Sequence, residues 1–274
     1  MREEIASDTA ASPRVPIAGD ATPFGHLAVV AEAVEANRMD VYLDPIMGLA
    51  DRKARHFELT VRLRDDVGQE IEPAEYVASV AGTGLLARID AAKLERAAEI
   101  VQRLKTRQSK AALFSSLTGE SLADENFLGS FADLLTDEDG MGARLVLSFS
   151  QAEARNFSTV HWQSISAMAS IGLKFALEEV TDLDMDFEML QQNGFTFVKL
   201  DAGVFLDGLP IAGGRVPPAD ICRHLAGLGF GLIVGGIVAE KDLARIHGFG
   251  AILGQGTLFG APRSVALERP QRAA

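Results

Sequence analysis

The sequence predicts an α/β fold, a (β/α)8 TIM-like barrel. Segments such as residues 143–150 (ARLVLSFS) and 195–201 (FTFVKLD) are nearly continuous apolar runs, which is typical of strands buried on both faces. Helical patterns separate most of these segments from one another. About eight such units in about 230 residues fit a closed barrel better than an open doubly wound sheet. No G-x-G-x-x-G follows a first strand, so a dinucleotide-binding fold lacks its main signal.

Helices and strands are expected to alternate along the chain. An amphipathic helix is expected at residues 25–38, followed by a strand near 41–46. Residues 56–64 (HFELTVRLR) alternate between apolar and polar side chains, which predicts a second strand. Further helices are expected at 73–83, 91–105, 124–135, 159–172, 186–194, 217–229 and 239–250. Further strands are expected at 110–117, 143–150, 174–180, 195–201, 231–237 and 251–256.

One domain is expected, over residues 25–265. Residues 1–24 are rich in Ala, Ser, Pro and Asp and are predicted to form a flexible tail, and residues 266–274 a second tail. No linker of Pro, Gly or Ser divides the repeating pattern. The N-terminal residues contain no long apolar run, so neither a signal peptide nor a membrane span is expected.

The charge and the cysteine count limit the partners. Asp plus Glu number 38 against 26 Lys plus Arg, a formal net charge of -12, which argues against binding DNA, RNA or anionic lipid. A small anionic ligand is not excluded, because one or two local arginines suffice for it. The single cysteine, Cys222, cannot form an intramolecular disulfide, which fits a reducing compartment and predicts a cytoplasmic protein.

In such a barrel the chemistry belongs at the C-terminal ends of the strands. The polar and small residues expected there are Glu58, Arg62, Arg64, Ser115, Ser116, Ser148, Ser150, Gln151, Glu178, Glu179, Lys199, Asp201, Gly235, Gly236 and Gln255. The adjacent Glu178 and Glu179 can form a structural ion pair with Lys199 on the next strand, hold a metal ion, or contact a ligand. Arg62 and Arg64 can grip a phosphate or neutralise neighbouring acids.

Several stretches together resemble one family. YLDPIMGL followed by FELTVRLR, then VKLD, and GAILGQGTLFGAP near the end are similar in order and spacing to EAL domains. These are bacterial phosphodiesterases that hydrolyse cyclic di-GMP to the linear dinucleotide. The resemblance covers about residues 25 to 265. It implies a barrel in which one strand is antiparallel to the others.

The resemblance carries part of the family's site onto this sequence. The Glu-Ala-Leu-x-Arg signature falls on residues 58–62, so the metal-binding Glu and the Arg are kept. The Lys and Asp of a later strand are also kept. The resemblance therefore implies ligand contacts at Glu58, Arg62, Lys199, Asp201 and Gln255.

Other positions depart from the family. The family's Asn falls on Ser116, its next metal-binding Glu on Ser148, and Ala-Glu-Gly-Val-Glu on residues 234–238, which lose both acids. The first-strand Gln is Asp44 here. The family's Asp-Asp falls on the longer Glu178 and Glu179, and metal–ligand distances tolerate only about 0.2 Å. Any metal site built from Glu58, Glu178 and Glu179 is therefore expected to be weak or vestigial.

The sequence thus predicts a catalytically inactive EAL-like signalling domain. It would act as a cyclic di-GMP receptor or as a scaffold for another signalling protein, and no cofactor is expected. The alternative is an active phosphodiesterase, in which Glu58 helps to hold Mg²⁺ or Mn²⁺ and Lys199 orients or deprotonates the water. A homodimer is left open, because the segment through which family members commonly pair is altered here to VTDLDMD.

Overall fold

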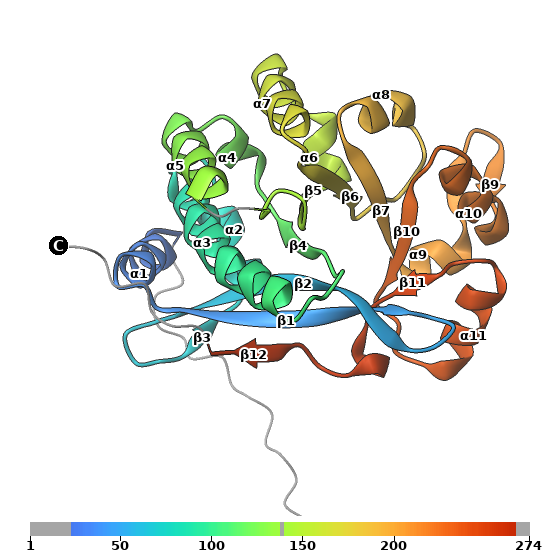
Figure 1. The fold of residues 1–274 in the computed structure, drawn as a ribbon, viewed down its shortest axis with the longest axis horizontal. Helices are drawn as coiled ribbons and strands as arrows, with labels where there is room; N and C mark the ends of the chain where they lie inside the picture. The colour runs from blue at the N-terminus through green and yellow to red at the C-terminus, as the bar shows by residue number, and fades with distance from the viewer. Residues whose placement is uncertain (1–22, 138–139, 267–274) are drawn as a thin grey trace, which may run out of the picture.

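The computed structural model describes residues 23–137 and 140–266, which form a closed eight-stranded barrel surrounded by helices (Figure 1). The expected tails, apart from residues 23, 24 and 266, lie outside the described residues. Around the barrel the strands follow the order β1-β11-β10-β7-β6-β5-β4-β2, and β1 pairs with β2 to close it. Their bounds are β1 Met39–Gly48, β2 Lys53–Arg64, β4 Leu113–Ser116, β5 Leu145–Ser150, β6 Lys174–Glu178, β7 Phe195–Asp201, β10 Gly231–Gly235 and β11 Leu253–Gly254.

Strand β1 is the antiparallel strand that the resemblance implied. It runs antiparallel to both barrel neighbours, β2 and β11, whereas the other neighbouring pairs in the barrel are parallel. Its register with β2 places Asp44 opposite Glu58 and Ile46 opposite His56. The prediction of a (β/α)8 TIM-like barrel with one antiparallel strand is confirmed.

Helices cover the outside of the barrel. Their bounds are α1 Pro23–Glu35, α2 Pro73–Val80, α3 Leu85–Thr106, α4 Gly119–Leu122, α5 Glu125–Asp137, α6 Gln151–Arg155, α7 Thr159–Ser170, α8 Phe187–Gln192, α9 Ala202–Asp207, α10 Pro218–Gly227 and α11 Glu240–Gly248. Smaller elements are β3 Glu70–Ile71, the hairpin β8 Leu209–Ile211 and β9 Gly214–Val216, the 3-10 turn Thr257–Phe259, and β12 Arg263–Val265, which pairs with β1. None of the helices in the described ranges is both long and apolar enough to cross a membrane.

The sequence pattern did not predict several of the short elements. Helices α4, α6 and α9 have four to six residues, and β3 has two. A hydrophobic period needs about two turns of helix or four strand residues to become visible, so tertiary contacts determine these pieces instead.

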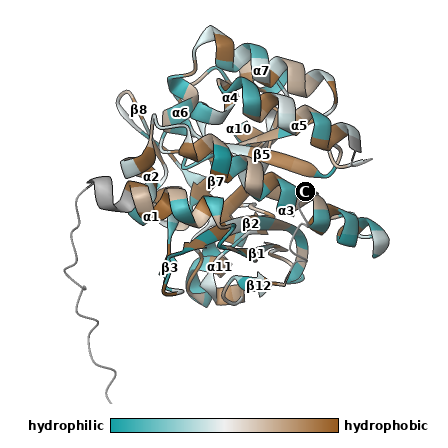
Figure 2. Cartoon of the chain, turned by 90° about the vertical axis from the view of Figure 1, so that its left-hand side faces the viewer, coloured by the Kyte–Doolittle hydropathy of each residue, from teal (hydrophilic) through white to brown (hydrophobic). Residues whose placement is uncertain are grey.

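Two layers of side chains fill the barrel interior. The lower layer is apolar and contains Ile46, Phe114, Val146, Ala176, Ile233 and Leu253. His56 lies beside it, with its ring 5.7 Å from that of Phe114 and 5.8 Å from that of Phe197. Outward-facing residues such as Leu59 and Leu63 are fully buried beneath the helices. In Figure 2 strand β5 is coloured as hydrophobic, while the surrounding helices carry hydrophilic residues as well.

The upper layer is polar. Because side chains alternate along a strand, the residues two positions nearer the C-terminal ends of the parallel strands share the inward face. These are Asp44, Glu58, Ser116, Ser148, Glu178, Lys199, Gly235 and Gln255. Thus the barrel collects at one mouth most of the side chains that the sequence singled out.

Candidate functional site

Glu58 and Lys199 form the centre of the mouth. The Lys199 ammonium (Nζ) lies 2.7 Å from each of the two carboxylate oxygens of Glu58. Their side chains are 24% and 14% exposed for Lys199 and Glu58, so water screens this pair only in part. Burial alone would lower the pKa of Lys199, but the carboxylates of Glu58 and Glu178 outweigh burial and raise that pKa. Lys199 is therefore a cation at neutral pH.

Gln255 joins the same carboxylate to Asp44. Its amide nitrogen Nε2 donates to Glu58 Oε2 and to Asp44 Oδ2, each at 2.7 Å. Backbone hydrogen bonds hold Gln255 in place, because its N–H donates to Val234 and its carbonyl accepts from Ile237. Burial and the negative charge of Glu58 raise the pKa of Asp44, against the hydrogen bond from Gln255. The amide oxygen of Gln255 is buried without a partner in the described residues.

Glu178 faces this cluster, and among the described residues it makes no ion-pair contact of its own. Burial raises its pKa to about 7, and the charge of Glu58 adds to that rise, while the nearby Lys199 opposes it. Near neutral pH the carboxyl is therefore protonated in a large fraction of molecules. The structural ion pair that the sequence suggested for Lys199 exists, but its partner is Glu58 rather than Glu178.

Glu179 and Asp201 lie at the rim. Glu179 is exposed and adopts the left-handed conformation, with φ of 54°, at the point where β6 ends. Asp201 ends β7, and its Oδ1 accepts from the backbone N–H of Gly203 at 2.7 Å, which caps helix α9. Together with Glu58, Glu178, Lys199 and the glycines at 235 and 236, these residues line a cavity of about 330 Å³.

Arg62 is held by other groups. Its Nη1 donates to Glu70 Oε2 at 2.7 Å, and its guanidinium lies 4.4 Å from the centre of the Tyr42 ring. Glu70 also accepts from the Tyr42 hydroxyl at 2.8 Å and from Arg64 at 2.9 Å. Arg62 follows Glu58 by four strand residues, or about 13 Å along the strand. Tyr42 and Glu70 were not among the predicted site residues, because their contacts depend on the position of β3, a strand too short to predict.

The donor set does not match a two-metal centre. Ser116 and Ser148 are register partners on β4 and β5, where the resemblance expects an amide and a carboxylate. At Gly235 an added Cβ would lie 3.3 Å from Cε of Lys199, so the lysine stem occupies space beside the position of a lost acid. Both oxygens of Glu58 already accept N–H hydrogen bonds. In the described ranges, no three His, Cys, Asp or Glu side chains form a group that could hold a metal ion.

A buried ion pair on helix α3 supports the mouth from outside. The Lys93 ammonium donates to Asp90 Oδ1 at 2.8 Å and to the carbonyl of Ser116 at the end of β4. Asp90 Oδ2 accepts from the hydroxyls of Thr118 and Ser121. Both charges are almost fully buried, and such a pair is stable only when hydrogen bonds satisfy both partners. The i,i+3 spacing of Asp90 and Lys93 was its only sequence signal.

Comparison with known proteins places this fold. A sequence model described as "EAL domain" matches residues 28–262. The cyclic di-GMP phosphodiesterase PdeB of Shewanella oneidensis is 21% identical over 242 residues, which are 86% of this chain and 28% of PdeB. The chain thus spans less than a third of that relative's length.

Solved structures agree in fold. The FimX EAL domain of Pseudomonas aeruginosa bound to cyclic di-GMP superposes with a TM-score of 0.72 at 23% identity, over 86% of this chain and 96% of that one. The FimX EAL domain of Xanthomonas citri in complex with cyclic di-GMP gives 0.74 at 18% identity, over 89% and 95%. At such identities the likeness establishes the fold alone.

Proposed function

The chain belongs to the EAL domain family, and on that basis we propose that it is a receptor that binds cyclic di-GMP without hydrolysing it. One observation carries the proposal. Lys199 and Gln255 together direct three N–H hydrogen bonds at the carboxylate of Glu58. In a metal-dependent phosphodiesterase that carboxylate would have to face a divalent ion, which needs bare oxygen atoms as ligands.

The mouth keeps features that suit binding. Glu58, Lys199, Asp201 and Gln255 stand where the resemblance expects ligand contacts, and the cavity beside them opens to solvent. The side chain of Arg62 is 32% exposed and its guanidinium stacks on Tyr42, which leaves donors for a phosphate at the rim. Because the pKa of Glu178 is about 7, its carboxyl is uncharged in part of the molecules at neutral pH, which reduces the repulsion that a dianionic dinucleotide would meet. Structures of related EAL domains contain this ligand.

The second candidate is a protein-interaction scaffold that needs no nucleotide. The carboxylate side chains of Asp44, Glu58, Glu179 and Asp201 favour it, because they gather at the mouth with one central cation, Lys199. Like charges next to a phosphodiester weaken its binding. A scaffold would use the barrel surface and leave the mouth closed by its own hydrogen bonds.

Calorimetric titration with cyclic di-GMP, with and without Mg²⁺, tests the proposal. We expect saturable binding in both conditions, with the nucleotide recovered intact by chromatography. Arg62→Gln should weaken binding about tenfold, the cost of a charge-assisted hydrogen bond. Arg223→Gln is the matched control, since Arg223 pairs with Asp220 on the exposed surface of α10.

Two other outcomes of this titration would overturn the proposal, each in favour of a different function. Linear dinucleotide that forms only with Mg²⁺ or Mn²⁺ would overturn the proposal in favour of an active phosphodiesterase. No heat and no product from folded protein would overturn it in favour of the scaffold.

A further inference from the structure

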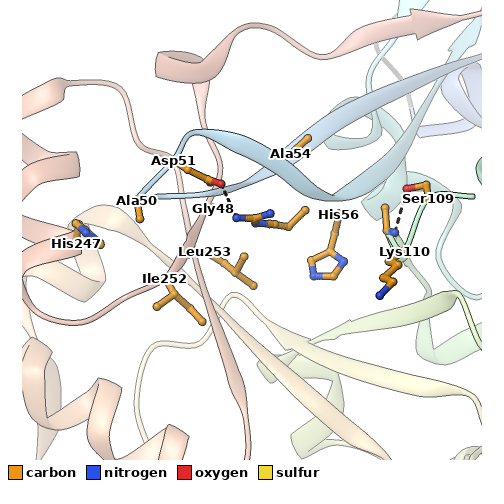
Figure 3. A pocket seen from close by; sticks show the side chains of 12 residues that line it. Gly48, Ala50, Asp51, Ala54, His56, Ser109, Lys110, His247, Ile252 and Leu253 are labelled. Carbon is orange, nitrogen blue, oxygen red and sulfur yellow. Dashed lines mark hydrogen bonds and ion pairs between the residues drawn. The ribbon is translucent and has the colours of Figure 1, made fainter.

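A second cavity lies at the opposite end of the barrel from the mouth. It measures about 580 Å³, compared with about 330 Å³ for the cavity at the mouth. Its walls come from the hairpin between β1 and β2, from residues 109–111 before β4, and from residues 247 and 252–253 around the start of β11 (Figure 3). His56 at this end and Glu58 at the mouth are one strand repeat apart on β2.

Cationic side chains outnumber anionic ones in the described lining of this cavity. Lys110 reaches it from the segment before β4 (Figure 3), and no hydrogen bond or ion pair of Lys110 occurs among the described residues. Arg55 contributes a guanidinium, whose Nη2 donates to Asp51 Oδ2 at 2.6 Å. Asp51 is the sole carboxylate in the described lining. The cavity is thus positive within a chain of net charge -12.

The neutral ring of His56 also offers a hydrogen-bond donor to the cavity. Its Nδ1 accepts the backbone N–H of Ala112 at 3.1 Å, so the proton of the neutral ring is on Nε2. Burial and the charge of Arg55 lower the pKa of His56, so the ring is neutral at neutral pH. No described residue accepts a hydrogen bond from Nε2–H.

The backbone makes room for this arrangement at Gly48. An added Cβ there would lie 2.8 Å from Nε of Arg55 and 2.9 Å from Oδ1 of Asp51. The ion pair of Arg55 and Asp51 therefore lies directly against the backbone of Gly48 at the edge of the cavity. Ile252 and Leu253 form an apolar wall, and Ile252 is 65% exposed.

We propose that this cavity is a binding site for a small organic anion, whose charged group meets Lys110, Arg55 and His56 while its apolar part covers Ile252 and Leu253. Cations, a neutral donor and an apolar wall within one concave site are the usual elements of such recognition. The site is separate from the mouth and does not depend on cyclic di-GMP.

Phenyl phosphate is the probe, and phenol, which keeps the aromatic ring but lacks the phosphate, is the uncharged control. Calorimetry should give saturable binding of phenyl phosphate and none of phenol, because the charged group supplies the contacts. Lys110→Gln should weaken binding about tenfold by removing one charge-assisted contact. Lys241→Gln, on the exposed surface of α11 and outside the cavity lining, should leave it unchanged.

Imidazole resonances of His56 in the unaltered protein give a second readout that needs no variant. Phenyl phosphate should shift the Nε2 signal of His56, while the Glu58 and Lys199 signals at the mouth stay in place. Absence of saturable binding overturns the proposal. So does binding that Lys110→Gln leaves unchanged, or a shift confined to the mouth.

Discussion

Glu58 and Lys199 are 141 residues apart in the chain and stand on strands that face each other across the barrel, yet their charged groups meet at 2.7 Å. β2 and β7 are four strands apart in either direction around the closed sheet. The ion pair therefore spans the interior, and Gln255 ties it to a third strand end. Removal of either charge should therefore disturb the hydrogen-bonded cluster across the whole mouth.

Lys199→Met should destabilise the fold by about 2 kcal/mol, because it leaves the Glu58 carboxylate partly buried without its cation. Glu58→Gln alone should also destabilise it. The double variant should recover part of the loss, since neither charge is then uncompensated. Urea denaturation of the four proteins checks this cycle. Arg223→Met, which breaks an exposed ion pair, should change the free energy of unfolding by less than about 0.5 kcal/mol.

Glu178→Gln should change how stability depends on pH. Folding raises the pKa of Glu178 from 4.5 to about 7, so its stabilising contribution is complete below about pH 4.5 and is lost as the pH rises through 7. The glutamine has no titratable carboxyl group, so the variant should not lose stability in this way as the pH rises. Its stability advantage over the natural sequence should grow by up to about 3 kcal/mol between pH 5 and pH 8. Glu179→Gln is the neighbouring control, and parallel pH profiles for Glu178→Gln and the natural protein would refute the prediction.

Mg²⁺ or Mn²⁺ at millimolar concentration should not raise the melting temperature. A metal that binds only the folded state stabilises it by mass action, and the Glu58 oxygens are engaged by Lys199 and Gln255. Differential scanning calorimetry with and without chelator measures this. A rise that the chelator reverses would mean that Lys199 yields its place to the ion.

Gly256→Ala should destabilise the barrel by about 2 kcal/mol or more, because its backbone has φ of 149° and an added Cβ would lie 2.3 Å from the Ile237 carbonyl oxygen. Gly227→Ala in helix α10 meets no atom within 4 Å and should instead stabilise the protein by about 0.5 to 1 kcal/mol. Urea denaturation of both variants supplies the contrast. Equal effects at the two positions would contradict the backbone argument.

The sequence predicted most of the barrel because long apolar strands and helices carry a clear period. The strand at residues 195–201 was predicted with its exact bounds. The antiparallel direction of β1 came from the family resemblance, since hydrophobic alternation is the same in either direction. The helices α4, α6 and α9 and the strand β3 escaped prediction because packing, rather than local pattern, decides them.

The candidate site was predictable as a set of strand ends but not as a set of contacts. The pairing of Lys199 with Glu58 depends on which strands stand opposite each other once the barrel closes. The contact of Arg62 with Glu70 depends on the two-residue strand β3. Both facts arise from tertiary geometry, so neither has a signal along the chain.

Strand β1 near the start of the chain closes the barrel by pairing with β11 near its end, and this has a consequence for folding. Met47 pairs with Gly254, and Asp44 meets Gln255 across 211 positions. Contacts of such long sequence separation form late, because the loop-closure entropy must be overcome first. During synthesis on a ribosome, therefore, the hairpin of β1 and β2 emerges early, and the edge of β1 that pairs with β11 stays unpaired until β11 has been made. The mouth is completed only at that final step.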